Sequence, residues 1–149
     1  MGLEIRPLQV FPDSAQWPLY LEMANDYFAE CWPSLVTDYE TELKKRIEEG
    51  GRGLFLYFQN EEPVGLSNVY LQGNSLHIAE FYVIPSKRRT GIGKAIVHQI
   101  INWGKGHHAK KLVLEVDKEL EGPNHFWSRF DFPCNSSGDR NIYSLKIPY

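Results

Sequence analysis

The sequence predicts a fold of mixed α/β (α+β) class, in which a mixed sheet carries helices on both faces. The first observation is that the spacing of apolar residues changes along the chain, from helical periods to short strand-like runs. The second is the resulting order: a strand, two helices, three strands, a helix, a strand, a short helix and two strands. The third is the length of 149 residues without a repeat or linker, which predicts a single domain over residues 1–149.

The first part of the chain predicts one strand and two helices. A short apolar segment over residues 3–8 is typical of a strand. From Trp17 to Phe28 apolar residues recur every three or four positions, which predicts a helix that Trp32-Pro33-Ser34 interrupts. A second, more charged helix follows over residues 37–50 and stops at a glycine pair.

The rest of the chain predicts an alternation of strands and helices. Two apolar runs around a polar turn form a hairpin, and a further run ends at a proline. An amphipathic helix and a near-continuous apolar strand follow, as expected for the interior of a sheet. The predicted strands are 53–58, 63–71, 76–84, 112–116, 132–135 and 142–147, and the predicted helices are 92–106 and 124–129.

The composition argues against several classes of protein. A net charge of −3 offers nothing to attract nucleic acid or an anionic membrane over the whole surface. No apolar run approaches ~18 residues and no leader-like start is seen, so neither a membrane span nor a signal peptide is expected. Cys31 and Cys134 are interpreted as reduced thiols of a cytoplasmic protein. His107 and His108 have no partner at ligand spacing, so no metal is predicted.

The most informative segment runs from Glu80 to Ala95. An apolar strand ends at Pro85, a basic turn with two glycines follows, and then a helix begins. Converging backbone N–H groups and the helix dipole make such a turn an anion site, which predicts a ligand with phosphates. The cations beside it are Lys87, Arg88, Arg89 and Lys94, and the glycines are Gly91 and Gly93, where no Cβ would block a ligand.

Two common phosphate motifs do not fit this turn. A P-loop would need its first glycine at Arg88 and a hydroxyl at Ala95. A dinucleotide fingerprint needs three glycines at the start of its fold, whereas this turn has two and follows some 80 residues of other structure. The plain alternative is a turn rich in glycine and arginine that binds no ligand.

Residues 88–93, Arg-Arg-Thr-Gly-Ile-Gly, do fit the pattern Arg/Gln-x-x-Gly-x-Gly/Ala between a strand and a helix. This segment resembles the acyl-CoA pyrophosphate loop of the GNAT superfamily of N-acetyltransferases, and the order of elements is similar over nearly the whole chain. The resemblance implies a mixed, mostly antiparallel sheet with a splay between its fourth and fifth strands. It also implies acetyl-CoA as cosubstrate, without a metal.

The resemblance assigns cofactor contacts to three segments. The pyrophosphate would bind the loop itself, at Arg88, Arg89, Thr90, Gly91, Ile92, Gly93 and Lys94. The pantetheine arm would run along the strand end at Tyr82 and Val83, where a backbone N–H near Val83 would polarise the thioester carbonyl. Asn124 and Trp127 on the short helix would flank the arm, although Asn124 stands closer to Trp127 than the family spacing.

Two glutamates are candidate catalytic bases. Glu80 interrupts an apolar strand three residues before Val83, where many relatives carry a carboxylate that accepts a proton from the amine. Its plain interpretation is a solvated glutamate at a strand edge. Glu115 interrupts the next strand in the same way, and an acidic residue there is often structural.

The chain departs from the family pattern where a tyrosine usually protonates the CoA sulfur. Trp127 stands at that position and Asp131 at a usual glycine. An indole N–H donates a hydrogen bond but is no acid near neutral pH. Either the thiolate leaves unaided or another group serves, with Tyr82 and Tyr143 as candidates.

The acceptor is expected to be a small-molecule primary amine that is polar or cationic, because aromatic and acidic residues gather on the first two helices. Trp32 and Tyr39, near the break between those helices, are the predicted acceptor residues. The alternatives are acetylation of a protein lysine or N-terminus, and a CoA-binding regulatory module without turnover. A monomer and a homodimer both stay open.

Overall fold

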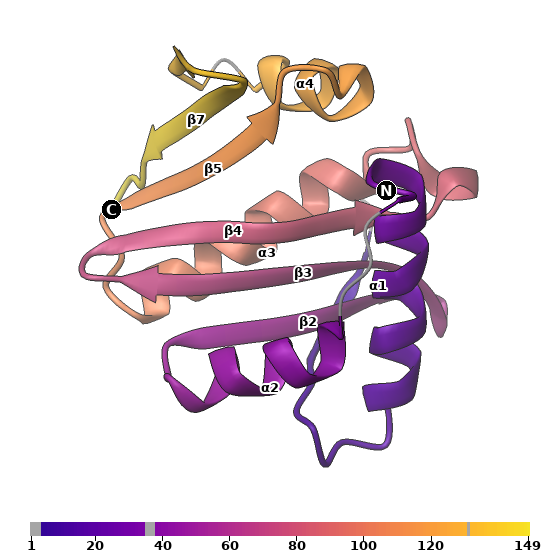
Figure 1. The fold of residues 1–149 in the computed structure, drawn as a ribbon. Coiled ribbons are helices and arrows are strands. Elements are labelled where there is room, and N and C mark those ends of the chain that lie inside the picture. Colours follow the sequence, from indigo (N-terminus) through magenta and orange to yellow (C-terminus); the bar gives the residue numbers. More distant parts are fainter. Residues whose placement is uncertain (1–3, 35–37, 131) are drawn as a thin grey trace.

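The computed structural model describes residues 4–34, 38–130 and 132–149. Its elements follow the predicted order, with a 3₁₀ turn added before the third α-helix (Figure 1). The strands are β1 (Arg6–Gln9), β2 (Arg52–Gln59), β3 (Glu62–Gln72), β4 (Ser75–Val83), β5 (Lys111–Asp117), β6 (Cys134–Ser137) and β7 (Arg140–Lys146). The helices are α1 (Trp17–Cys31), α2 (Tyr39–Glu48), η1 (Pro85–Lys87), α3 (Ile92–Gly106) and α4 (Glu121–Ser128).

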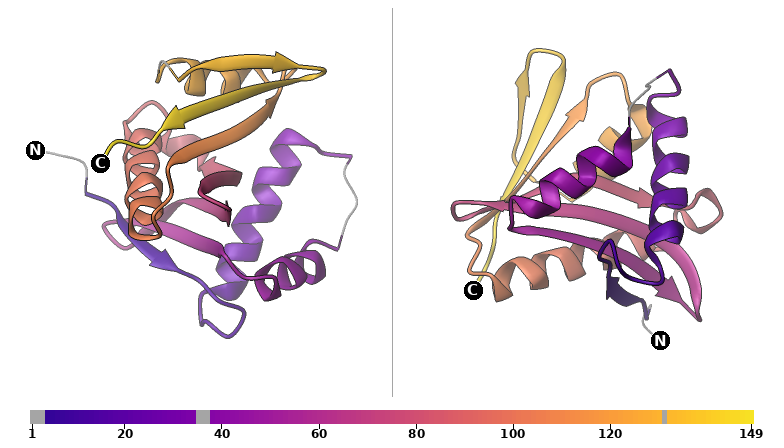
Figure 2. Two further views of the ribbon diagram at one scale, coloured as in Figure 1. Left: turned by 90° about the vertical axis from the view of Figure 1, so that its left-hand side faces the viewer. Right: turned by 60° about the horizontal axis from the view of Figure 1, so that its bottom comes forward.

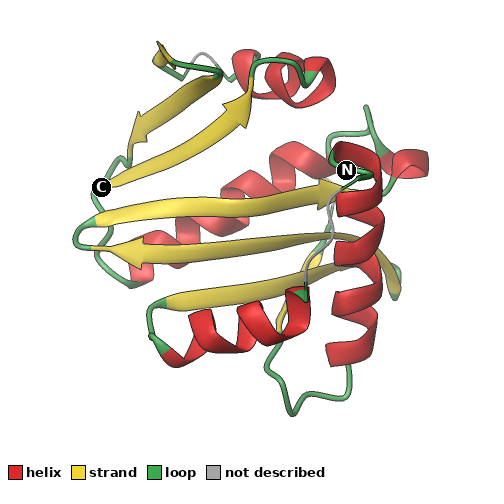
Figure 3. Ribbon diagram, viewed as in Figure 1, coloured by secondary structure: helices red, strands yellow, loops and turns green. Residues whose placement is uncertain are grey.

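The strands form one sheet in the order β1-β2-β3-β4-β5-β7-β6. Every neighbouring pair is antiparallel except β4 and β5, which are parallel. Pairing of β4 with β5 covers only Ser75–Ile78 against Lys111–Leu114, and beyond it the two strands diverge (Figure 3). We call this divergence the β4–β5 fork: residues 80–83 of β4 and 115–117 of β5. The predicted mixed, mostly antiparallel sheet with a splay there is confirmed.

Helices cover both faces of the sheet (Figure 2), and each face has its own core of buried side chains. Helices α1 and α2 pack on one face, where Tyr20 of α1 is fully buried against Leu54 and Leu66 of the sheet. Helix α3 packs on the opposite face, where Ile92, Ile96 and other apolar residues meet β4 and β5. We call these the α1 face and the α3 face.

A β-bulge in β4 decides which side chains face which core. Asn68 of β3 pairs with Glu80, but the next β3 residue, Val69, pairs with Ile78, so Ala79 is the extra residue. Strict alternation would place Ile78 and Glu80 on the same face. The bulge instead leaves Ile78 in the core of the α3 face and turns Glu80 toward the α1 face.

Several element boundaries differ from those predicted. Helix α4 begins at Glu121, three residues earlier than expected, since Pro123 is accommodated in its first turn. Strands β6 and β7 are displaced by about two residues, because a glycine turn at Gly138, with a φ of 60°, sets the hairpin. The predicted helix start at Thr37 and the expected role of Asp131 lie outside the described residues.

Candidate functional site

The loop between β4 and α3 has the backbone geometry of an anion site. Arg89 and Gly91 both adopt positive φ angles, 64° and 89°, and Gly91 is the N-cap of α3. The first internal hydrogen bond of the helix is donated by the Ala95 N–H to the Gly91 carbonyl. The N–H groups of Ile92, Gly93 and Lys94 therefore end at the open helix N-terminus, where an anion is stabilised. The side chain of Ile92 is fully buried, so only its backbone can serve a ligand.

The cations near this loop differ in their availability. Arg88 donates from Nη2 to Glu30 of α1 at 2.8 Å and from Nε to the Val83 carbonyl at 2.9 Å. Lys87 pairs with Glu62 at 3.5 Å. Arg89 and Lys94 are exposed and form no ion pair with a described residue. The sequence predicts one patch of four cations. In the structure, however, Arg88 uses its guanidinium to connect the loop to α1 and β4.

Gly93, whose missing side chain is expected to make room for a ligand, also has a packing role in the structure. A Cβ at Gly93 would lie 2.7 Å from Cε1 of the Phe126 ring on α4. Such a distance is far below ordinary contact, so Gly93 allows α4 to pack closely on α3. The conformational requirement for glycine in this loop is at Gly91, where φ is positive.

The β4–β5 fork exposes backbone groups at the end of β4. The Ile84 N–H donates to Val64 of β3 at 3.0 Å. Because neighbouring residues of a strand point their N–H groups to opposite edges, the Val83 N–H points away from β3 and into the fork. The side chains of Tyr82 and Val83 are buried on opposite faces of the sheet, Tyr82 against α1 and Val83 against α3.

The C-terminal end of α1 spans the fork on the α1 face. Trp32, which follows the helix, donates its indole N–H to Asp117 of β5 at 2.9 Å. The Glu30–Arg88 pair fastens the same helix end to the loop after β4. On the same helix, the Tyr27 ring makes T-shaped contacts with both Trp32 and Tyr82. The predicted acceptor residue Trp32 therefore lies beside the fork.

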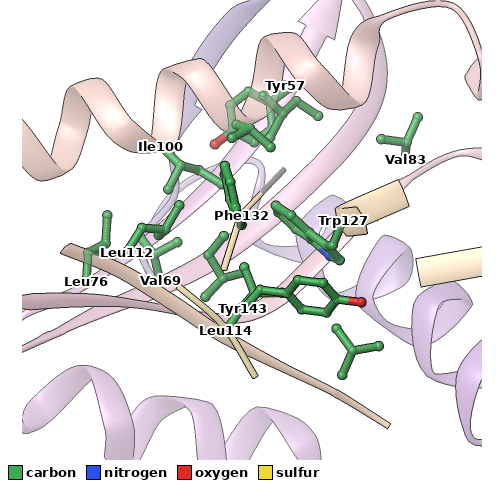
Figure 4. Close-up of a cluster of buried hydrophobic side chains, with 14 of the residues drawn as sticks. Tyr57, Val69, Leu76, Val83, Ile100, Leu112, Leu114, Trp127, Phe132 and Tyr143 are labelled. Atoms are coloured by element: carbon green, nitrogen blue, oxygen red, sulfur yellow. The ribbon is translucent and has the colours of Figure 1, made fainter. Parts of the chain in front are cut away.

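On the α3 face an aromatic cluster packs beside the fork, and Figure 4 shows two of its members, Trp127 and Phe132, among the buried side chains of that core. Trp127 is 3% exposed and packs against Phe81 of β4, with a ring-centroid distance of 5.0 Å. The further members of the cluster are Phe126, Phe130 and Phe132. Trp127 thus belongs to the core beneath the fork.

Asn124 joins α4 to the two strands beside it. Its amide donates to the carbonyls of Asp117 and Leu120 at 2.9 and 2.8 Å. Its oxygen accepts from Asn141 Nδ2 and from the Tyr143 hydroxyl, each at 2.9 Å. An asparagine side chain has two donors and two acceptor positions, so these bonds use all four. A cofactor contact at Asn124 would have to replace one of them.

Glu80 is the centre of a hydrogen-bonded network on the α1 face. The Tyr39 hydroxyl of α2 and the Asn68 amide of β3, the latter at 3.1 Å, both donate to Oε1 of Glu80. Arg52 of β2 donates to the Asn68 oxygen at 2.8 Å. Burial raises the pKa of the Glu80 carboxyl, and the hydrogen bonds from Tyr39 and Asn68 and the charge of Arg52 act against that rise. Burial also raises the pKa of the Tyr39 hydroxyl, which keeps it a proton donor.

A cavity of about 690 Å³ lies over Glu80. Its walls come from α2, from the start of β2 and from β3, and Ala79 and Glu80 of the bulge contribute to its floor. Tyr39 lines this cavity and Trp32 does not. The structure therefore brings together Glu80 and one of the two predicted acceptor residues, and places the other at the fork.

Glu115 lies outside this network. Its side chain is about half exposed and pairs with Arg140 of β7 at 3.7 Å. Among the described residues no group of three or more His, Cys, Asp and Glu side chains is arranged to hold a metal ion. Within the described ranges no helix has the length and hydropathy needed to cross a membrane.

The chain belongs to the acetyltransferase (GNAT) family, whose sequence profile matches residues 17–132. That result confirms the family indicated by the loop motif and the order of elements. Streptothricin acetyltransferase A of Bacillus subtilis (strain 168) is 29% identical over 99 residues. This match covers 66% of the chain and 57% of that relative's length.

Solved structures share the fold at low sequence identity. A GNAT-family acetyltransferase from Staphylococcus aureus Mu50 superimposes with a TM-score of 0.79 at 15% identity, covering 97% of this chain and 100% of the other. A GNAT-family acetyltransferase from Elizabethkingia anophelis, solved with acetyl-CoA bound, gives a TM-score of 0.71 at 16% identity, with 96% and 98% covered.

Two residues of the Glu80 network, Asn68 and Arg52, are not indicated as functional by any sequence motif. Asn68 stands in an apolar strand and is 2% exposed, and a polar residue inside such a run was the available signal. Arg52 opens β2 between two glycines, where nothing in the local sequence indicates its partner.

Proposed function

We propose that the protein transfers the acetyl group of acetyl-CoA to a primary amine of a small molecule, by direct attack within a ternary complex. The observation that carries this proposal is the placement of Glu80. A partly buried carboxylate lies at the floor of a cavity, beside a strand fork, with both of its neighbouring hydrogen-bond donors on Oε1. Oε2 is then the oxygen that accepts the proton of an incoming amine, directly or through one water.

The cofactor would bind on the opposite side of the fork from the acceptor. Its pyrophosphate would lie on the N–H groups of Ile92, Gly93 and Lys94, with Arg89 and Lys94 as the free cations. The pantetheine arm would run along β4, and the Val83 N–H would polarise the thioester carbonyl. The bound acetyl-CoA of the Elizabethkingia anophelis structure supports this cosubstrate for the shared fold.

The remaining predicted residues have supporting roles in this arrangement. Asn124 positions α4, because its four hydrogen-bonding positions are used within the protein. Trp127 shapes the base of the fork and supplies no proton. The Tyr143 hydroxyl donates to Asn124, which leaves Tyr82 as the phenol that can approach the leaving thiolate.

The proposal is tested by release of free CoA thiol from acetyl-CoA across a panel of amines that includes streptothricin, the acceptor named for the Bacillus subtilis relative. Glu80→Gln should lower kcat by about 10²–10⁴-fold while leaving acetyl-CoA affinity nearly unchanged, since the carboxylate acts on the amine. Glu115→Gln is the matched control and should retain activity. Full activity of Glu80→Gln with loss in Glu115→Gln would move the base to Glu115.

A further inference from the structure

The floor of the cavity over Glu80 holds a second charge that the proposed chemistry does not use. The guanidinium of Arg52 is stacked over the Tyr70 ring at 4.7 Å and donates from Nη1 to Asn68. Its Nε is buried and has no hydrogen-bond partner among the described residues. No described carboxylate lies within 4.0 Å of it either. A buried donor without a partner costs stability, so the protein itself leaves the Arg52 guanidinium incompletely compensated.

Arg52 and Glu80 are held at a defined separation by one side chain. The oxygen of the Asn68 amide accepts from Arg52, and its nitrogen donates to Glu80 at 3.1 Å. The cavity floor therefore presents the cation of Arg52 and the anion of Glu80, separated by the side-chain amide of Asn68. This pairing is complementary to a ligand that carries an ammonium and a negatively charged oxygen a few bonds apart.

The charges at the rim of the same cavity are already compensated. Glu49 pairs with Arg46 in the last turn of α2 at 3.6 Å, and Glu42 pairs with Lys45 of the same helix at 3.7 Å. A ligand with several positive charges would find only Glu80 without an ion-pair partner among the described lining residues, and would meet Arg52 beside it. A phosphate would meet a single free guanidinium, which suits a carboxylate better.

We propose that the acceptor is an amine that also carries a carboxylate, an amino acid in the general chemical sense, with Arg52 binding the carboxylate and Glu80 facing the amine. This inference rests on the proposed function for the identity of the reacting group. It narrows the acceptor from any small primary amine to one with both charges. Arg52 is then a specificity-determining residue.

The test measures binding, so that it does not depend on turnover. Amino acids and their decarboxylated counterparts, such as L-lysine with cadaverine and β-alanine with ethylamine, are titrated by calorimetry onto the protein saturated with CoA. In at least one pair the amino acid should bind about 10- to 100-fold more tightly, as expected for a hydrogen-bonded charge. Equal affinities, tighter binding of the decarboxylated amines, or no binding by any pair would overturn the inference.

Two variants assign the preference to Arg52. Arg52→Gln should reduce the ratio of the two affinities to near one, and Arg52→Lys should retain part of it because the charge remains. Arg46→Gln is the matched control in the same cavity and should leave the ratio unchanged. A purely structural role for Arg52 would weaken both ligands equally and keep the ratio, which refutes the proposal. Normal CoA affinity verifies the fold of each variant, and intact binding without acetyl transfer would refute only the proposed function.

Discussion

The close approach of Gly93 to Phe126 allows a quantitative prediction about how α3 and α4 are joined. In Gly93→Ala the new Cβ would lie 2.7 Å from Cε1 and 3.0 Å from Cζ of the Phe126 ring. Carbon atoms prefer a separation of about 3.5–4.0 Å, so the ring must move by roughly 1 Å. The ring is surrounded by Phe81, Trp127 and Phe130, with centroids 4.9–5.3 Å away, and has little room to do so.

Overpacking of this kind costs about 1–3 kcal/mol, and the helix propensity of alanine offsets about 0.5–1 kcal/mol of it. The free energy of unfolding should therefore fall by up to about 2.5 kcal/mol, with a central value of about 1 kcal/mol, which lowers Tm by up to roughly 10 °C for a chain of this size. Urea unfolding measures the first quantity and a thermal scan the second. Gly106→Ala in the same helix is the control, since its Cβ would meet nothing within 4 Å. We expect Gly106→Ala to be as stable as the parent or slightly more stable.

A double-mutant cycle tests whether Phe126 is the residue that a side chain at position 93 would overpack. Phe126→Leu removes the ring edge, so the cost of Gly93→Ala should be largely relieved in the double variant. The same four proteins are titrated with CoA. If affinity recovers together with stability, Gly93 acts through α4, and if it stays weak, a side chain at 93 meets the cofactor directly. Unchanged stability of Gly93→Ala, or a cost that Phe126→Leu does not relieve, would refute the packing argument.

Three further predictions concern the site. Tyr39→Phe removes a hydrogen bond that lowers the pKa of the Glu80 carboxyl. Because the ionised carboxylate is the base, the acidic limb of the pH profile of kcat/KM should move to higher pH. An unmoved limb would exclude Glu80 as the base whose pKa Tyr39 sets. Asn124→Ala leaves buried groups of α4, β5 and β7 without partners and should lower the free energy of unfolding by at least about 1–3 kcal/mol, checked by urea titration. Trp127→Ala should lower it by about 3–5 kcal/mol through the cavity left in the aromatic cluster, and its CoA affinity should fall in calorimetry; wild-type stability would contradict the burial seen here.

Features set by local sequence could be predicted, and features set by register or by distant partners could not. The strand–glycine–helix segment around Gly91 is local, and its motif indicated both the fold and the family. The placement of Glu80 required the bulge at Ala79, which depends on how β4 pairs with β3. No periodicity within β4 itself reveals such a change of face.

Long-range partners account for the other differences. Arg88 and Glu30 are 58 positions apart in sequence, so the local motif could not show that this cation is committed to α1. The same holds for Gly93, whose neighbour Phe126 belongs to a helix two elements later. In both cases the role depends on a tertiary contact: the ion pair of the Arg88 side chain with Glu30, and the room that the absent Cβ of Gly93 leaves for Phe126.

The bulge in β4 has a consequence for how this chain can change in length. A substitution at Ala79 leaves the parity of the strand intact on both sides. Deletion of that single residue would remove the bulge and make Ile78 and Glu80 adjacent, and strict alternation would then keep them on opposite faces, as they are now. A strand of the present length without a bulge would instead turn either Glu80 and Tyr82 into the α3 face or Leu76 and Ile78 out of it. Removal of this one residue is therefore compatible with both core and site, whereas loss of the bulge at unchanged length is not.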